Sequence, residues 1–325
     1  MRKKLLAIIT ASIMAMSILA GCTKQEEAVT AKVAALNGPT GMGLVKMMDD
    51  EKDTDNYEFT LVGAPDEITA KLVKGEYDIA AVPANLASVL YNNTEGNIQT
   101  LAVNTLGVLY IVENGNTVKS VSDLKGKTIY ASGKGSTPEY ALNYILEQNG
   151  IDPAKDVTIE YKSEHAECLS AMAADENGIA MLPQPFVTVA MTKNPNIRVA
   201  IDLNEEWDKL NAKDNESGSL ITGVVVARKD FVEKYPEKTK SFLEEYKSSV
   251  EFTNNNIDEA AALIGENDIV PEAIAKKAIP ECNITFISGD EMKTKLSGYL
   301  KVLSEANPKA VGGKLPGDDF YYVEQ

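Results

Sequence analysis

The 325-residue sequence is poor in histidine, cysteine and aromatic residues: it contains one histidine, three cysteines and 6% Phe, Trp and Tyr. A structural zinc site needs several closely spaced cysteine or histidine ligands, and a disulfide scaffold needs a high density of cysteines, so neither is expected. Basic residues are also scarce, since 32 Lys and Arg stand against 48 Asp and Glu, a net charge of −16. Nucleic-acid binding depends on a basic surface, so no nucleic-acid partner is expected.

Beyond the first residues, the sequence has no apolar run long enough to cross a bilayer. What is present is the composition of a globular protein, with 44% hydrophobic and 25% charged residues. At roughly 150 residues a domain, the length suggests about two domains with proper cores.

The first residues have the pattern of an export signal. Three basic residues at 2–4 precede an apolar stretch at 5–18 that is shorter than a membrane span, and the stretch ends in LAGC at 19–22. This ending resembles the bacterial lipobox, which implies that residues 1–21 are removed as a signal peptide and that Cys22 is lipidated. An ordinary secretory signal that contains a cysteine is the alternative. Two acyl chains would hold the protein firmly on a membrane, with the polar residues 22–30 as a tether.

The other two cysteines are Cys168 and Cys282. The sequence does not fix the distance between them, so a disulfide between them stays open. Cys168 lies in a segment with a helical pattern, where a buried free thiol is the commoner outcome.

Short apolar segments alternate with helical patterns along most of the chain. This alternation is typical of βαβ units and of a mostly parallel, buried sheet, and it predicts an α/β protein. The predicted strands lie at 32–36, 57–62, 78–82, 127–132, 157–162, 178–182, 198–203 and 220–227. The longer predicted helices lie at 138–149, 164–174, 236–252 and 290–303, and an acidic helix is expected around Trp207.

Two long apolar segments each contain a central glycine. Residues 99–113 contain Gly107, and residues 220–227 contain Gly223. We interpret the first as a strand that leaves one α/β unit followed by a strand that enters another, and the second as the return. Glycine at each crossing could absorb the backbone change of a hinge. The predicted division is residues 31–105 plus 224–325 for one lobe and 106–223 for the other; one large α/β domain is the alternative.

Three motifs in this order resemble a known family. GEYDIAAVP at 75–83 ends a predicted strand in a turn, VSDLKGKTI at 121–129 opens the second unit, and VARKDF at 226–231 follows the return. Together with the lipobox, they make the chain similar to substrate-binding lipoproteins of ABC transporters of the nitrate, sulfonate, taurine and thiamine-precursor type. The resemblance implies a type II periplasmic-binding-protein fold, in which two Rossmann-like α/β lobes joined by two crossover strands close on a small solute.

The resemblance also implies partners and a location. An ABC permease and an ATPase would be the partners, because the sequence itself lacks the phosphate-binding motif GxxxxGK[ST]. The protein would be a monomer held on the outer face of the cell membrane, without a cofactor. Enzymes of the thiamine-precursor type use a cysteine-rich motif and a donor histidine that are not recognisable here, so no enzymatic activity is expected. The lone His165 is expected on the surface.

Candidate ligand-binding residues follow from the strand ends, because ligands of open α/β sheets lie beyond the carboxyl ends of the strands. Glycines there let backbone N–H groups approach a ligand, and helix N-termini favour negative charge. Tight turns and helix caps without a ligand are the alternative. The candidates are Gly38, Thr40, Gly41, Met42, Pro83, Asn85, Lys134, Ser136, Thr137, Gln184, Phe186 and Thr222.

The class of solute stays open between two alternatives. Helix N-termini and Lys134 favour an anionic group such as a sulfonate, carboxylate or nitrate. A planar heteroaromatic ring stacked on Phe186 is the competitor, since such pockets need few charges. Two other functions also stay open: a ligand-sensing lipoprotein that signals to a membrane receptor, and an exported enzyme on the same scaffold.

Overall fold

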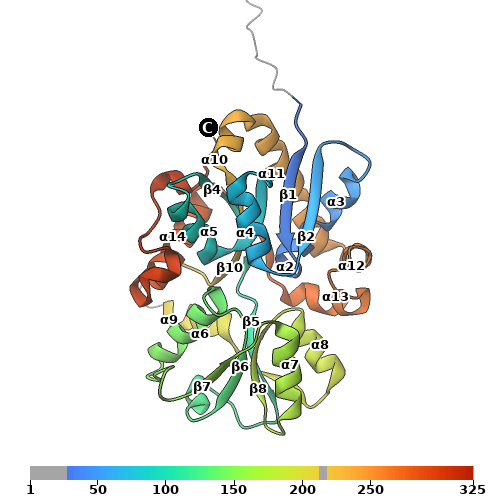
Figure 1. Ribbon diagram of the computed structural model, residues 1–325. Coiled ribbons are helices and arrows are strands. Elements are labelled where there is room, and N and C mark those ends of the chain that lie inside the picture. Colours follow the sequence, from blue (N-terminus) through green and yellow to red (C-terminus); the bar gives the residue numbers. More distant parts are fainter. Residues whose placement is uncertain (1–27, 212–217, 325) are drawn as a thin grey trace, which may run out of the picture.

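The computed structural model describes residues 28–211 and 218–324, so the signal peptide, Cys22 and most of the tether lie outside the described residues. Within these ranges the chain forms two α/β lobes, each built on one sheet, as Figure 1 shows with lobe 1 above and lobe 2 below. The predicted α/β, two-lobed fold class is therefore confirmed. No helix of the described residues is long and apolar enough to cross a membrane.

Lobe 1 contains a six-stranded sheet in the order β11-β4-β10-β3-β1-β2. Strands β1, β2 and β3 are parallel, whereas β10 runs antiparallel to both of its neighbours. The strands are β1 (Ala31–Leu36), β2 (Tyr57–Val62), β3 (Ile79–Pro83), β4 (Ile98–Leu106), β10 (Ile221–Arg228) and β11 (Ile284–Ile287).

Two layers of helices cover this sheet. The helices are α2 (Pro39–Met42), α3 (Val45–Glu51), α4 (Pro65–Lys74), α5 (Ala84–Asn93), α10 (Lys229–Lys234), α11 (Pro236–Asn255), α12 (Ile257–Glu266), α13 (Glu272–Ala278) and α14 (Gly289–Ala306). One core lies under α4, α5 and α14, and the other lies under α3, α11 and α12. Burial on both faces explains the continuous apolar runs at 79–82 in β3 and 224–227 in β10.

Lobe 2 contains a five-stranded sheet in the order β7-β6-β8-β5-β9. Its strands are β5 (Leu109–Asn114), β6 (Thr128–Ala131), β7 (Thr158–Tyr161), β8 (Ile179–Pro183) and β9 (Ile197–Asp202). Its helices are α6 (Thr137–Gln148), α7 (His165–Ala174), α8 (Phe186–Lys193) and α9 (Leu203–Asn211). Strands β7, β6 and β8 are parallel, which places their carboxyl ends at one edge of the sheet.

The apolar segment 99–113 is two strands, as its length and central glycine predicted: β4 ends in lobe 1, and β5 begins in lobe 2. The two glycines are explained by close packing rather than by an unusual backbone conformation. A Cβ at Gly107 would collide with the side chain of Asn204, and one at Gly223 would lie 2.6 Å from Asn104 Oδ1 and from Thr40 Cγ2. A hinge movement at these glycines remains a prediction.

The structure adds one strand to those predicted and answers one open question. Strand β11 was not predicted. Cys168 and Cys282 are both buried free thiols, so they do not pair with each other.

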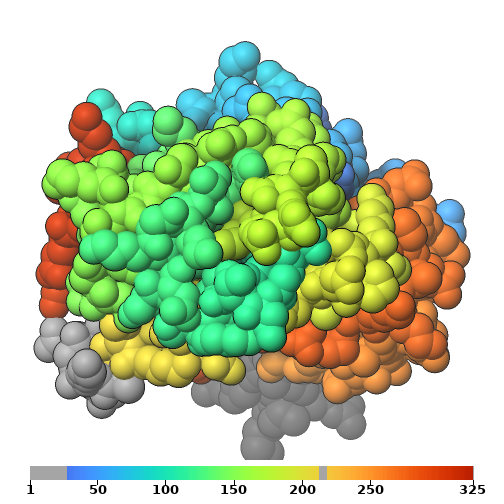
Figure 2. Space-filling view, turned by 90° about the horizontal axis from the view of Figure 1, so that it is seen from below, coloured from blue at the N-terminus to red at the C-terminus, as the bar shows by residue number. Residues whose placement is uncertain are grey.

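The lobes are packed together along one side of the molecule. A single apolar core includes residues of α6 and α9 in lobe 2 and of α14 in lobe 1. Trp207 lies at its centre, fully buried, with its ring 4.8 Å from that of Tyr144 in lobe 2 and 5.4 Å from that of Tyr299 in lobe 1. The acidic helix expected around Trp207 is α9. Figure 2 shows a further contact, where the yellow segment that contains α8 lies against the orange segment that contains α13.

Candidate ligand-binding site

The parallel strands of both lobes have their carboxyl ends beside the crossover between the lobes. In lobe 1, Pro83 at the end of β3 pairs with Gly223, where the chain returns from lobe 2. In lobe 2, Pro183 at the end of β8 pairs with Leu109, where the chain arrives from lobe 1. The strand ends of the two lobes therefore face each other beside the crossover, which is where ligands of open α/β sheets bind.

In lobe 1, the loop at 38–42 is tightly packed against its own strand. Gly38 has a φ of +112°, which only glycine adopts readily. The Thr40 hydroxyl donates to the Leu36 carbonyl at 3.1 Å, and a Cβ at Gly41 would lie only 2.7 Å from the same carbonyl oxygen. Met42 is fully buried in the core under α3 and α11. The structure thus places Met42 away from the strand-end surface and leaves Thr40 and Gly41 beside it.

Two candidate residues from different lobes bind each other. Asn85, in the first turn of α5 beside Pro83, accepts hydrogen bonds through Oδ1 from the backbone N–H of Thr137 at 3.0 Å and from its hydroxyl at 3.1 Å. Tyr299 donates to the same hydroxyl at 3.4 Å. Asn85 and Thr137 are each 1% exposed, and Tyr299 is fully buried. In this closed arrangement the two side chains serve contact between the lobes.

The loop before α6 contains two further candidates. Ser136 is the cap residue of α6, and its hydroxyl donates to the Gly133 carbonyl at 2.8 Å. Lys134 is exposed, with its Nζ 5.7 Å from the centre of the Tyr161 ring. The helix predicted at 138–149 is α6, which begins at Thr137 and has Pro138 in its first turn.

The last three candidates lie at the end of β8 and in the crossover. Gln184 is buried and accepts from the hydroxyl of Thr188 at 2.9 Å, so it is engaged within its own helix start. The Thr222 hydroxyl donates to the Leu106 carbonyl at 2.5 Å and ties the two crossover strands together. Phe186 is partly buried, and its ring lies 4.9 Å from the ring of His165.

Sequence reasoning missed Ser132 and His165, which the structure brings together at the strand ends of lobe 2. Ser132 follows β6, His165 begins α7, and the Ser132 Oγ lies 2.5 Å from His165 Nδ1. The expectation that His165 is a surface residue is wrong, because it is partly buried and packs on Phe186. Ser132 is the last residue of the predicted strand 127–132, and His165 follows the predicted strand 157–162, so the rule that selected the other candidates would have found them.

Burial makes this histidine an uncharged group. It lowers the pKa of His165 to about 4, so the imidazole is neutral near pH 7. Nearby, the Tyr161 hydroxyl is buried and has no hydrogen-bond partner among residues 28–211 and 218–324. Burial and the Glu139 carboxylate raise the pKa of Tyr161, which keeps the phenol protonated. We call Ser132, Lys134, Tyr161, His165 and Phe186 the lobe 2 face.

Two observations bear on the chemistry that the lobe 2 face could support. Ser132 is only 3% exposed, so its hydroxyl is not available as a nucleophile. In the part of the chain that the structure describes, no carboxylate is hydrogen-bonded to His165, and no group of three His, Cys, Asp or Glu side chains could hold a metal ion. The face offers one ring surface, one phenol, one neutral imidazole and one exposed ammonium group.

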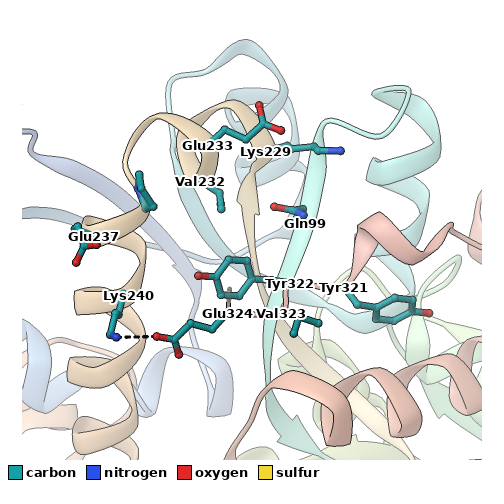
Figure 3. A pocket seen from close by; sticks show the side chains of 11 residues that line it. Gln99, Lys229, Val232, Glu233, Glu237, Lys240, Tyr321, Tyr322, Val323 and Glu324 are labelled. Carbon is teal, nitrogen blue, oxygen red and sulfur yellow. Dashed lines mark ion pairs between the residues drawn. The ribbon is translucent and has the colours of Figure 1, made fainter. Parts of the chain in front are cut away.

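A separate cavity of about 670 Å³ lies at the far end of lobe 1, where β4 begins and β10 ends (Figure 3). The C-terminal segment forms one wall, with Tyr321 and Tyr322. Its lysines are already paired: Lys240 with Glu324 at 2.8 Å, and Lys229 with Asp319 at 3.0 Å. The cavity lies at the opposite end of the lobe 1 sheet from the carboxyl end of β3, so it is not part of the candidate site.

Comparison with known proteins agrees with this geometry. Residues 43–266 match the family described as the periplasmic phosphonate substrate-binding protein of ABC transporters. The chain belongs to this family. It is a periplasmic substrate-binding protein of the kind that serves ABC importers, which confirms the function expected from the motifs. The matching family is of the phosphonate type, a type that the motif resemblance did not name.

Individual relatives are more distant. The chain is 23% identical over 256 residues to the "Putative binding protein YtlA" of Bacillus subtilis (strain 168), a match that covers 75% of this chain and 72% of the relative. It is similar to the crystal structure of an ABC transporter protein from Parabacteroides distasonis, with 27% identity, a TM-score of 0.76, and 92% and 100% of the two chains covered. The periplasmic aliphatic sulphonate binding protein SsuA from Escherichia coli has the same fold, with 17% identity, a TM-score of 0.73, and 92% and 94% covered.

Proposed function

We propose that the mature chain is anchored to the outer face of the membrane through lipidated Cys22, captures a small solute between its lobes and delivers it to an ABC permease and its ATPase. The opposed strand ends of the two lobes carry this proposal, because a solute between them would touch both lobes only when they are closed. Binding would therefore favour the closed state by the difference in contacts. The order of the motifs and the LAGC sequence at 19–22 support the anchor.

The lobe 2 face favours a solute with a flat ring or with a single anionic group. The Phe186 ring provides a surface for stacking, and the neutral His165 imidazole beside it can hydrogen-bond to a heterocycle. Lys134 is the one positive charge of this face and would serve an anion. The chain would act by binding rather than by turnover, since the Ser132 hydroxyl is buried.

A thermal-shift screen tests the proposed binding. It would compare methylphosphonate, sulfonates, carboxylates, nitrate, pyrimidines and small aromatic heterocycles. A solute present at one hundred times its Kd stabilises the native state by about 2.7 kcal/mol, which raises the Tm visibly. We expect at least one class to raise the Tm of the wild type, and Phe186→Ala to reduce that rise. If no class raises the Tm, or if the bound compound is turned over, the proposal fails.

The anchor has a test of its own. The wild type is expected in the membrane fraction of the producing cell, and the Cys22→Ala variant in the fraction that contains no membrane. An unchanged distribution of the variant would show that the membrane association does not depend on lipidation of Cys22. This result would leave the solute-binding test unaffected.

A further inference from the structure

The N-terminus of α6 is occupied from within the protein. The first backbone N–H groups of a helix have no partner in the helix, and helix ends of this kind bind anions in many proteins. Here the Thr137 N–H is bound by Asn85 Oδ1 at 3.0 Å, across the boundary between the lobes. We propose that Asn85 is an internal, uncharged ligand of this helix end, which bridges the two lobes and excludes tetrahedral oxyanions from the end of α6. This inference rests on the proposed solute-binding function.

The orientation of the Asn85 amide is fixed by contacts on its own side. Its Nδ2 donates to the Ala310 carbonyl at 3.1 Å. One face of α5 continues this pattern, since Ser88 donates to the Val311 carbonyl at 2.9 Å and Asn92 donates to the same carbonyl at 2.8 Å. Because the amide nitrogen is committed to a carbonyl, the amide oxygen must face Thr137. The contact of its amide nitrogen with Ala310 thus helps to fix the acceptor toward lobe 2.

The hydrogen-bonding groups of Thr137 in this contact are also fully engaged within the protein. Its hydroxyl donates to Asn85 Oδ1 at 3.1 Å and accepts from Tyr299 at 3.4 Å. All three side chains are at most 1% exposed. A phosphonate or sulfonate oxygen could reach the Thr137 N–H only by displacing the amide oxygen. The solute must therefore make its contacts elsewhere, and the lobe 2 face offers a ring surface with neutral hydrogen-bonding groups.

The contact can be followed by the fluorescence of Trp207, the single tryptophan of the chain. It is fully buried and lies between the rings of Tyr144 of lobe 2 and Tyr299 of lobe 1, tilted by 48° and 52° to them. Opening of the lobes would remove Tyr299 from the indole and admit water. We call Asn85, Thr137, Trp207 and Tyr299 the interlobe contact.

The decisive comparison is between Asn85→Ala and Asn92→Ala. Both remove an asparagine side chain from α5 that binds the C-terminal segment, but only Asn85 touches lobe 2. For Asn85→Ala we expect a red-shifted Trp207 emission, stronger quenching by acrylamide and a larger radius of gyration in X-ray scattering. We also expect at least a tenfold gain in affinity for methylphosphonate or sulfate. Asn92→Ala should behave as the wild type in all four measurements.

The outcomes separate this inference from the proposed function. An Asn85→Ala variant that stays compact and gains no affinity for either anion would overturn the inference. So would tight binding of methylphosphonate by the wild type with the Trp207 emission unchanged. A wild type that binds no solute at all, beside an Asn85→Ala variant that opens, would overturn the proposed function and leave the internal contact standing.

A second variant protects the test if Asn85→Ala does not fold. Thr137→Val keeps the backbone N–H bond to Asn85 and loses only the hydroxyl bonds. We expect its Trp207 emission and acrylamide quenching to change in the same direction as in Asn85→Ala, but by a smaller amount. A Thr137→Val variant with wild-type emission and quenching would contradict the inference.

Discussion

The interlobe contact joins the two lobes, whereas the lobe 2 face belongs to lobe 2 alone, and the two regions use their polar atoms differently. In the interlobe contact, the amide of Asn85 and the hydroxyl of Thr137 are bonded inside the protein and almost fully buried. In the lobe 2 face, the Tyr161 hydroxyl has no partner among the described residues, and Lys134 is exposed. Closure and solute binding therefore depend on different side chains, so mutation can separate them.

The largest effect is expected in the interlobe contact. Trp207→Ala should lower the free energy of unfolding by about 3–5 kcal/mol, because the indole fills the core shared by α6, α9 and α14. Urea unfolding followed by circular dichroism measures this, since the variant has no tryptophan. Trp207→Phe keeps a ring in place and should lose clearly less. A loss below about 1 kcal/mol for Trp207→Ala would show that this side of the molecule is not a common core.

A second substitution extends the comparison to the strand ends of lobe 1. Gly41→Ala should lower the free energy of unfolding by about 1–3 kcal/mol, because its Cβ would lie 2.7 Å from the Leu36 carbonyl oxygen. Gly63→Ala is the matched control: it follows β2, and a Cβ there would have no heavy atom within 4 Å. Urea unfolding of the two variants should therefore differ. Equal free energies of unfolding for the two variants would mean that helix α2 can shift away from the Leu36 carbonyl.

The third prediction concerns pH. The unfolded His165 titrates near pH 6.5, whereas the folded one stays neutral down to about pH 4. The unfolded state thus binds more protons between these values, and the free energy of unfolding should fall as the pH is lowered through this window, by about 1–2 kcal/mol for a partly exposed group. Above pH 6.5 this contribution is complete.

The matched variant for this prediction is His165→Asn. Urea unfolding at pH 7 and pH 4.5 should show a smaller difference for the variant than for the wild type. An equal pH dependence in both proteins would mean that His165 titrates normally in the native state and that the lobe 2 face is open to water.

The smallest change is expected for a side chain that serves the solute alone. Phe186→Ala should weaken binding of the solute found in the screen about tenfold, or about 1.4 kcal/mol, with little change in the free energy of unfolding because Phe186 is partly exposed. Phe286 is a partly buried phenylalanine of lobe 1. Phe286→Ala should lower the free energy of unfolding and leave the affinity for the solute nearly unchanged. Titration calorimetry with urea unfolding measures both. Loss of stability without loss of affinity in Phe186→Ala would make that ring a structural one.

Much of the fold could be predicted because strands that are buried on both faces appear in the sequence as short apolar segments. The predicted strand 157–162 and helix 164–174 correspond to β7 and α7 within two residues at each end. Strand β11 gave no such signal, since it has four residues, three of them only partly buried, and lies at the edge of the sheet among helices. Its formation depends on pairing with β4, which is far away in the sequence.

The candidate site was predictable in position but not in its bonding. The strand ends indicated Asn85, yet its hydrogen-bond partners Thr137 and Ala310 lie 52 and 225 residues away in the chain. No local pattern shows that such a side chain is already engaged. His165 was misjudged because the acidic residues around it indicate a solvated helix, and only the fold brings its ring onto Phe186.

The two crossings between the lobes have a mechanical consequence. Strands β4 and β10 are hydrogen-bonded neighbours up to the pair Ile221 and Leu106, and the Thr222 hydroxyl fastens one to the other at the boundary. Both connections therefore belong to one two-stranded ribbon, and its paired strands should move together when the lobes move. Any relative motion of the two lobes should accordingly be a rotation about these crossover strands, which brings the same atoms of the two lobes back into contact at each closure.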